Sequence, residues 1–150
     1  VEGADEVLQL PVRRLVEDRR LMLCDDSIVR GTQLKDNVRA LFAIGAREVH
    51  VRLDCPALIF PFEFLNFSTS RSTLDLLGRK TIHAIEGAEE KNLDRYARDG
   101  SPEHEALVEA LRARLGLTSL RYQRLDDLVA AIGLPREHLC THCWNRGCCP

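Results

Sequence analysis

The sequence lacks most of the features that would assign it to a specialised class of protein. No apolar run approaches the length that crosses a bilayer, and no charged and then apolar start resembles a secretory signal. Aromatic residues make up only 5% of the chain and the formal net charge is −2, which argues against a nucleic-acid surface. At 150 residues the chain fits one ordinary domain. We therefore expect a globular protein with no membrane or nucleic-acid partner. Because residue 1 is Val rather than Met, we also expect a fragment or a processed form.

The cysteines are unevenly placed, which argues against a disulfide-stapled secreted domain. Such a domain spreads its cysteines over a small, loop-rich chain. Here two of the six, Cys24 and Cys55, lie in apolar, strand-like surroundings. The other four crowd the last residues, as Cys140, Cys143, Cys148 and Cys149. We predict a reducing compartment, and hence the cytoplasm. The terminal group then predicts a metal or cluster site, or spare thiols.

A strand, a loop, a helix and a second strand follow one another early in the chain. Leu21 to Cys24 is apolar without alternation, which predicts a strand buried on both faces. Val49 to Leu53 predicts the next strand, and Gly45 stands where a helix C-terminus favours a left-handed residue. The helix between them is indicated by apolar residues at helical spacing, namely Leu34, Val38, Leu41 and Phe42. This order predicts a βαβ unit with parallel strands and a right-handed crossover.

Two acids and a polar loop follow the first strand directly. Asp25 and Asp26 stand at its carboxyl end, where open parallel sheets bind ligands. Adjacent carboxylates repel each other unless a cation or hydroxyl donors relieve them, and Gly31 lets the backbone approach a phosphate at the helix start. The loop lacks the spaced glycines of nucleoside-triphosphate and dinucleotide motifs. A phosphoribosyl group would use both halves, so the predicted binding residues are Asp25, Asp26, Ser27, Ile28, Val29, Arg30, Gly31 and Thr32.

The rest of the chain divides into three regions. Residues 1–85 are expected to form the core with the loop at 21–32, and 56–67 are an irregular, aromatic segment. Residues 86–100 are highly charged and are expected to be a solvent-exposed insertion. Residues 101–150 are expected to be a helical tail that ends in a cysteine-rich segment. Its first helix begins with Ser101 as cap and Pro102 at the first helical position. The apolar positions of this helix are Leu107, Leu111 and Leu115; those of the next, which Gly133 ends, are Leu125, Leu128, Val129 and Ile132.

The apolar strand followed by Asp-Asp-Ser-Ile-Val-Arg-Gly-Thr resembles the phosphoribosyl-pyrophosphate (PRPP) loop of type I phosphoribosyltransferases. Segments outside the loop are similar to the glutamine PRPP amidotransferase branch of that family, which carries out the first committed step of purine synthesis. They are Pro11 to Val16, Gly45 to Arg52, Cys55 to Pro61, Ser68 to Arg71, Leu120 to Gly133, and Cys140-x-x-Cys143-Trp144. Nearly the whole chain outside the charged insertion is covered.

The resemblance implies a partial type I phosphoribosyltransferase core of the α/β, parallel-sheet class with a C-terminal helical tail. The family displaces pyrophosphate from PRPP with ammonia from glutamine and forms phosphoribosylamine. On this basis Asp25 and Asp26 hold ribose hydroxyls and help to bind Mg²⁺, and residues 27–32 hold the 5-phosphate. The glutaminase domain, with its N-terminal cysteine, and the pyrophosphate-binding loop are not in this chain. We therefore expect no catalytic residue here, a fragment that is inactive alone, and a homo-oligomer.

In the bacterial branch of the family that carries a 4Fe–4S cluster, a terminal C-x-x-C supplies two of the four ligands. Cys140 and Cys143 match that pair. The resemblance places a third ligand directly after Pro61, where this chain has Phe62. Cys55 could substitute, although an inert buried thiol is the simpler interpretation, and Cys148 or Cys149 could compensate. Trp144 is expected to pack the tail onto the domain.

Three other functions stay open at this level. One is a base-salvage phosphoribosyltransferase, against which the long tail argues. A second is a non-catalytic PRPP-binding regulator, which a helix-turn-helix with a basic face would favour; none is visible. A third is a zinc-binding interaction module that uses only the tail.

Overall fold

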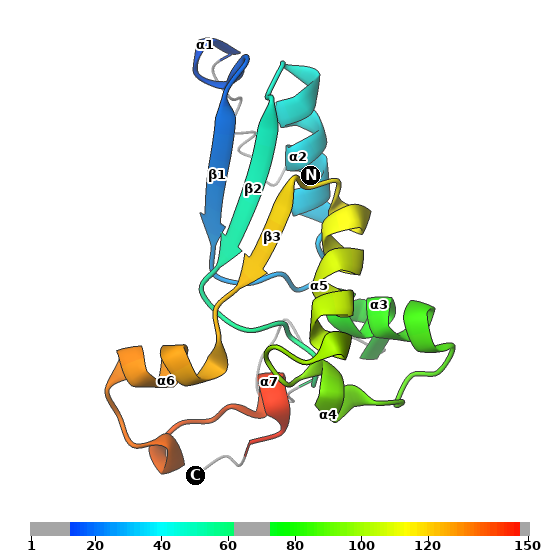
Figure 1. Ribbon diagram of the computed structural model, residues 1–150, viewed down its shortest axis with the longest axis vertical. Helices are drawn as coiled ribbons and strands as arrows, with labels where there is room; N and C mark the ends of the chain where they lie inside the picture. Colours follow the sequence, from blue (N-terminus) through cyan, green and yellow to red (C-terminus); the bar gives the residue numbers. More distant parts are fainter. Residues whose placement is uncertain (1–12, 62–72, 148–150) are drawn as a thin grey trace, which may run out of the picture.

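The computed structural model describes residues 13–61 and 73–147, and these form a parallel sheet with helices (Figure 1). The strands are β1 (Arg20–Asp25), β2 (Glu48–Leu53) and β3 (Ser119–Tyr122), in the order β1-β2-β3. Both strand pairs are parallel. The predicted α/β, parallel-sheet class is thereby confirmed. β3 was not predicted, and it lies within the region that was expected to be helical.

The expected βαβ unit is formed by β1, α2 (Thr32–Ala43) and β2. Gly45 adopts a φ of 98° after the helix, and its carbonyl accepts a hydrogen bond from the Asp18 N–H at 2.7 Å. The register places Asp25 opposite Leu53. The carboxyl ends of β1 and β2 therefore meet at one edge of the sheet, as the pattern predicted.

Helices α2 and α5 (Pro102–Leu115) lie on one face of the sheet, and no helix of the described residues covers the other face in Figure 1. Between sheet and helices lies an apolar core that includes Val49, Val51, Leu107 and Leu111, all fully buried. The expectation that the first strand is buried on both faces is wrong, because no helix of the described residues covers the open face of β1. Leu21 and Leu23 are half-buried against the core, whereas Met22 on the open face is 63% exposed.

The open face carries a polar network around His50. Its Nδ1 lies 2.8 Å from Ser119 Oγ on β3, and its Nε2 lies 2.9 Å from Glu48 Oε2 on the same strand. Arg52 donates a further hydrogen bond to Ser119 Oγ at 3.1 Å. These contacts join β2 to β3 through side chains, which is a structural role for His50.

The remaining helices gather near the carboxyl end of the sheet, except for the short α1 (Arg13–Val16) at the opposite end (Figure 1). They are η1 (Thr73–Asp75), α3 (Leu77–Glu86), α4 (Leu93–Tyr96), α6 (Leu125–Ile132), η2 (Arg136–His138) and α7 (His142–Asn145). Both predicted helices after residue 100 are present. α6, however, buries only Leu125, and Ile132 is 48% exposed. No helix of the described ranges is long and apolar enough to cross a membrane.

The charged segment 86–100 is anchored to the domain rather than fully exposed. Leu93 and Tyr96 of α4 are buried in the core cluster, because α4 packs against α5. Glu86 accepts hydrogen bonds from Tyr96 Oη at 2.9 Å and from the Asn92 amide at 3.2 Å, and Lys91 pairs with it at 2.8 Å. These donors, Lys91 first, lower the pKa of Glu86 to about 2. The expectation of a solvent-exposed insertion therefore holds for most of its charged side chains but not for Leu93 and Tyr96.

The N-terminus of α5 supports a direct stability test. Ser101 Oγ accepts a hydrogen bond from the His104 N–H at 3.0 Å, as its sequence position predicted. We expect Ser101→Ala to lower the free energy of unfolding by about 1 kcal/mol, whereas Ser101→Thr keeps the hydroxyl, which also donates to the Arg95 carbonyl at 2.6 Å, and loses much less. Urea unfolding followed by circular dichroism measures both variants, and equal losses would contradict the capping role.

Candidate functional site

A cavity of about 760 Å³ opens at the carboxyl end of β1, and it brings together every residue that the sequence singled out there. The loop 26–31 leads from β1 to α2, so the cavity spans a strand end and a helix start. Gln33 and Leu34 of the first turn of α2 were not predicted but also line it. The complete lining is Asp25, Asp26, Ser27, Ile28, Val29, Arg30, Gly31, Thr32, Gln33 and Leu34.

The two acids are held by the backbone that follows them. Asp25 Oδ1 accepts the Asp26 N–H at 3.0 Å, and Asp26 Oδ1 accepts the Ser27 N–H at 2.8 Å. Each carboxylate thus uses one oxygen to fix the turn. The two carboxyl groups also lie within hydrogen-bonding reach of each other, and this contact raises the pKa of Asp25. Both side chains are exposed to the cavity side of the sheet edge, where their oxygens are available to hydroxyl groups or a cation.

A third carboxylate lies close to the pair. Asp54 follows β2 directly, and its N–H donates to the Asp25 carbonyl at 3.1 Å. Partial burial raises the pKa of Asp25, and the negative charges of Asp26 and Asp54 raise it further. The strand end therefore concentrates negative charge that a cation would relieve. Asp54 was missed in the sequence, although its place directly after a parallel neighbouring strand was the signal that could have found it.

The loop half of the site is shaped by a close approach at Gly31. This residue has a φ of 72°, and a Cβ built on it would lie 2.5 Å from Leu77 Cδ2 of α3. The Leu77 N–H donates to the Val29 carbonyl at 2.8 Å, so the start of α3 fixes the loop from behind. Only glycine meets both requirements, the left-handed backbone and the lack of space.

Behind the acids runs the segment 54–60, whose residues from Pro56 to Phe60 are buried. It packs closely on α3: a Cβ on Gly78 would lie 2.6 Å from the Leu58 carbonyl oxygen. The part of the predicted aromatic segment at 62–67, Phe62 included, lies outside the described residues, as does Ser68 to Arg71. The described part is irregular, as predicted, and packs against α3 behind the acids.

The donor set at the acids fits a magnesium ion. Mg²⁺ prefers oxygen ligands and is commonly held by one or two carboxylates together with the phosphates of a substrate. Asp25 and Asp26 supply such carboxylates at the edge of a polar cavity. No group of three or more His, Cys, Asp or Glu side chains arranged to hold a metal occurs in the described ranges. The ion would therefore depend on the substrate for its other ligands.

The described thiols do not fit a 4Fe–4S cluster. Cys140 and Cys143 stand at the start of α7, Cys55 is close enough for Cys143 to raise its pKa, and Cys24 lies apart on the open face of β1. No three of these cysteines lie together in an arrangement that could hold a metal in residues 13–61 and 73–147. The candidates Cys148 and Cys149 lie outside those residues. We assign no step to a cluster.

Comparison with known proteins identifies the class of fold. No model of a protein family matches the chain. A solved structure of the glutamine PRPP amidotransferase from B. subtilis, complexed with ADP and GMP, superposes with a TM-score of 0.62 at 26% identity, over 89% of this chain and 24% of that one. A second, described as the allosteric regulatory enzyme of purine biosynthesis, has the same TM-score at 25% identity. The fold is thus that of the phosphoribosyltransferase-type core in these enzymes.

Curated relatives make the relation specific. The amidophosphoribosyltransferase of Methanothermobacter thermautotrophicus is 30% identical over 142 residues, which are 95% of this chain and 24% of the relative. That of Methanocaldococcus jannaschii is 32% identical over 133 residues, 89% of this chain and 22% of the relative. The chain is similar to these amidophosphoribosyltransferases and spans about a quarter of the length of the curated relatives it matches. The resemblance predicted from the sequence is confirmed.

Gly31 offers a matched pair of variants. Gly87 has a nearly equal φ of 70° but open space around its Cα, so Gly87→Ala measures the backbone cost alone, about 1 kcal/mol. Gly31→Ala adds the contact with Leu77, and we expect it to lower the free energy of unfolding by about 1–3 kcal/mol more. Chemical denaturation of both variants tests this. Equal losses would contradict the close approach of α3.

Cys55 supports a pH test. Burial, which is the main cause, raises the pKa of its thiol to about 11, so the folded protein keeps it protonated at neutral pH and forms thiolate only as the pH rises toward that value. Because the thiolate is the nucleophile, we expect iodoacetamide to label Cys55 far more slowly than the exposed Cys24 at pH 8. Peptide mass spectrometry gives both rates while circular dichroism confirms folding. Similar rates for the two thiols would refute the assignment.

Proposed function

We propose that this chain carries the PRPP-binding part of an amidophosphoribosyltransferase, the enzyme of the first committed step of de novo purine synthesis. One observation carries the proposal: the eight predicted loop residues line a single cavity at the carboxyl end of β1. The names of the relatives and structural neighbours support it.

In this proposal Asp25 and Asp26 accept hydrogen bonds from the vicinal ribose hydroxyls of PRPP. The carboxylate oxygens that face the cavity would provide the acceptors. Mg²⁺ would bind beside them, share these oxygens with the pyrophosphate and neutralise its charge. The acid pair also places negative charge near the ribose, where it stabilises positive charge that develops at C1.

The loop and α2 hold the 5-phosphate. Backbone N–H groups at the start of a helix have no intrahelical acceptors and point at the ligand, and the helix dipole favours an anion there. Ser27 and Thr32 add hydroxyl donors, and Arg30 lies on the exposed side of the loop where it can balance charge. Gly31 keeps the backbone free of a Cβ at this approach.

In the reaction so proposed, ammonia attacks C1 of the ribose while the bond from C1 to the pyrophosphate oxygen breaks. The products are 5-phosphoribosylamine and pyrophosphate, and glutamine supplies the ammonia on a glutaminase domain outside this chain. The residues described here orient the sugar and stabilise charge rather than attack it. The homo-oligomer and the cytoplasmic location stay predictions.

The acids provide the test. In the full-length protein we expect Mg²⁺-dependent binding of PRPP, measured by isothermal titration calorimetry. Asp25→Asn and Asp26→Asn should each weaken it about 10-fold or more, because hydrogen bonds from hydroxyls to a charged acceptor are lost. Asp127→Asn on the exposed face of α6 is the control and should bind as the parent does.

Unchanged affinity in both acid variants would overturn the assignment of the ribose. Ammonia-dependent release of pyrophosphate distinguishes the alternatives. A protein that binds PRPP without this turnover would be a regulator, and turnover with a free purine base instead of ammonia would indicate a salvage enzyme.

A further inference from the structure

The last described helix, α7, holds the buried segment behind the acids by a shared backbone acceptor. The Cys143 carbonyl oxygen accepts hydrogen bonds from both the Ile59 and the Phe60 N–H, each at 3.0 Å. These donors are buried, so without α7 they would lose partners that water does not readily replace. The end of the segment 54–60 is thereby tied to α7.

The beginning of the same segment contacts the side chain of Trp144. The Trp144 indole lies close enough to the Cys55 thiol to lower its pKa against the larger effect of burial. The buried Trp144 Nε1 has no hydrogen-bond partner among the described residues. The contact is therefore mainly one of packing.

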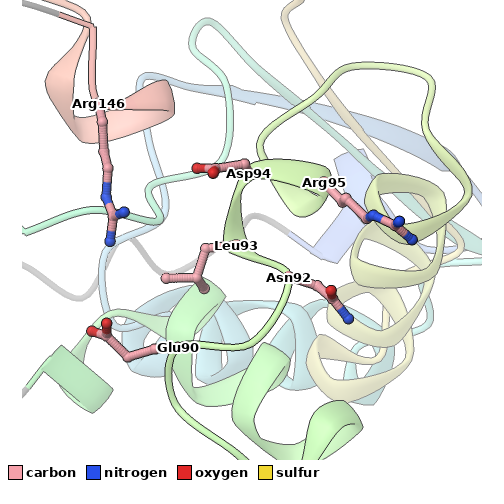
Figure 2. A pocket seen from close by; sticks show the side chains of 6 residues that line it. All are labelled: Glu90, Asn92, Leu93, Asp94, Arg95 and Arg146. Carbon is pink, nitrogen blue, oxygen red and sulfur yellow. The ribbon is translucent and has the colours of Figure 1, made fainter.

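A third contact joins the end of α7 to the segment 54–60. Arg146 follows α7, and its guanidinium lies 4.6 Å above the centre of the Phe60 ring. Figure 2 shows the same side chain on one wall of a cavity of about 320 Å³, with Glu90 and Leu93 nearby and Asn92 and Arg95 on the far side. The cavity is lined by charges of both signs. We assign it no ligand. Arg146, which follows α7, and residues of α4 line the same cavity.

The segment that α7 holds touches both halves of the PRPP site. At its start, the Asp54 N–H binds the Asp25 carbonyl, which fixes the strand end that carries the acids. At its middle, the Leu58 carbonyl lies against Gly78, and the adjacent Leu77 N–H binds the Val29 carbonyl in the phosphate loop. A continuous series of backbone contacts therefore runs from α7 to the acids and to the loop.

We propose that α7 positions the PRPP site through the Cys143 carbonyl, with Trp144 as a positioning residue beside it. The inference rests on the proposed function, because it assigns the loop to PRPP. Trp144 touches no substrate in this arrangement; it acts through Cys55 and the segment 54–60. Loss of its ring would let the segment relax away from α3 and β1. The acids and the loop would then lose their common support.

The experiment compares Trp144→Ala with Trp144→Phe in the full-length protein. Phe keeps an aromatic ring at the packing contact and loses only an N–H without a hydrogen-bond partner among the described residues, so it should behave nearly as the parent. We expect Trp144→Ala to raise the Kd and the KM for PRPP about 10-fold, since small misplacements of binding groups are costly. The KM for ammonia should change little. Hydrogen–deuterium exchange of residues 27–31 should rise in Trp144→Ala alone.

The matched control is Arg136→Ala, which removes an ion pair to Asp126 elsewhere in the tail and should leave PRPP binding and exchange unchanged. Unchanged affinity and unchanged exchange in Trp144→Ala would overturn the proposal. If that variant does not fold, Arg146→Gln removes only the contact with Phe60. An increase in loop exchange then supports the proposal, and no increase overturns it. A parent protein that fails to bind PRPP would refute the proposed function, whereas the exchange of residues 27–31 still tests the role of α7.

Discussion

The parallel pairing of β1 with β2 is the constraint on which the rest of the site depends. The register that sets Asp25 opposite Leu53 brings the next residues of both strands to one edge, so Asp26 and Asp54 must lie close together. Their mutual repulsion is a cost that the fold retains. It is offset locally by backbone N–H donors to Asp25 and Asp26, and it makes this edge the natural place for cations and hydroxyl groups.

What could be predicted from the sequence was local. The βαβ unit follows from spacing within about thirty residues, and the cap at Ser101 from one hydroxyl before a proline. The exposure of Met22 could not be predicted, because burial of a strand depends on what covers its faces. β3 was missed because four residues show too little alternation to stand out between two helices.

For the site, the sequence predicted the residues that follow β1 but not those that support them. Leu77 has an apolar side chain with no motif of its own, and Trp144 was expected only to pack the tail onto the domain; their relation to the loop arises from the tertiary fold. The charged segment gave a similar error. Its composition predicts exposure to solvent. Tyr96 is nevertheless buried, because its hydroxyl donates a hydrogen bond to the charged acceptor Glu86. Burying a phenol that has such a hydrogen-bond partner costs little free energy, and composition alone does not reveal the partner.

The shared acceptor at Cys143 has a consequence for the order in which the chain is made. Synthesis runs from the N-terminus, so β1, the loop and α2 leave the ribosome well before α7 does. Until α7 has been synthesised, the N–H groups of Ile59 and Phe60 lack the Cys143 carbonyl as an acceptor and are left to water. The end of the segment 54–60 is then not held in place. The residues that begin the site are thus synthesised well before the contact that completes its support.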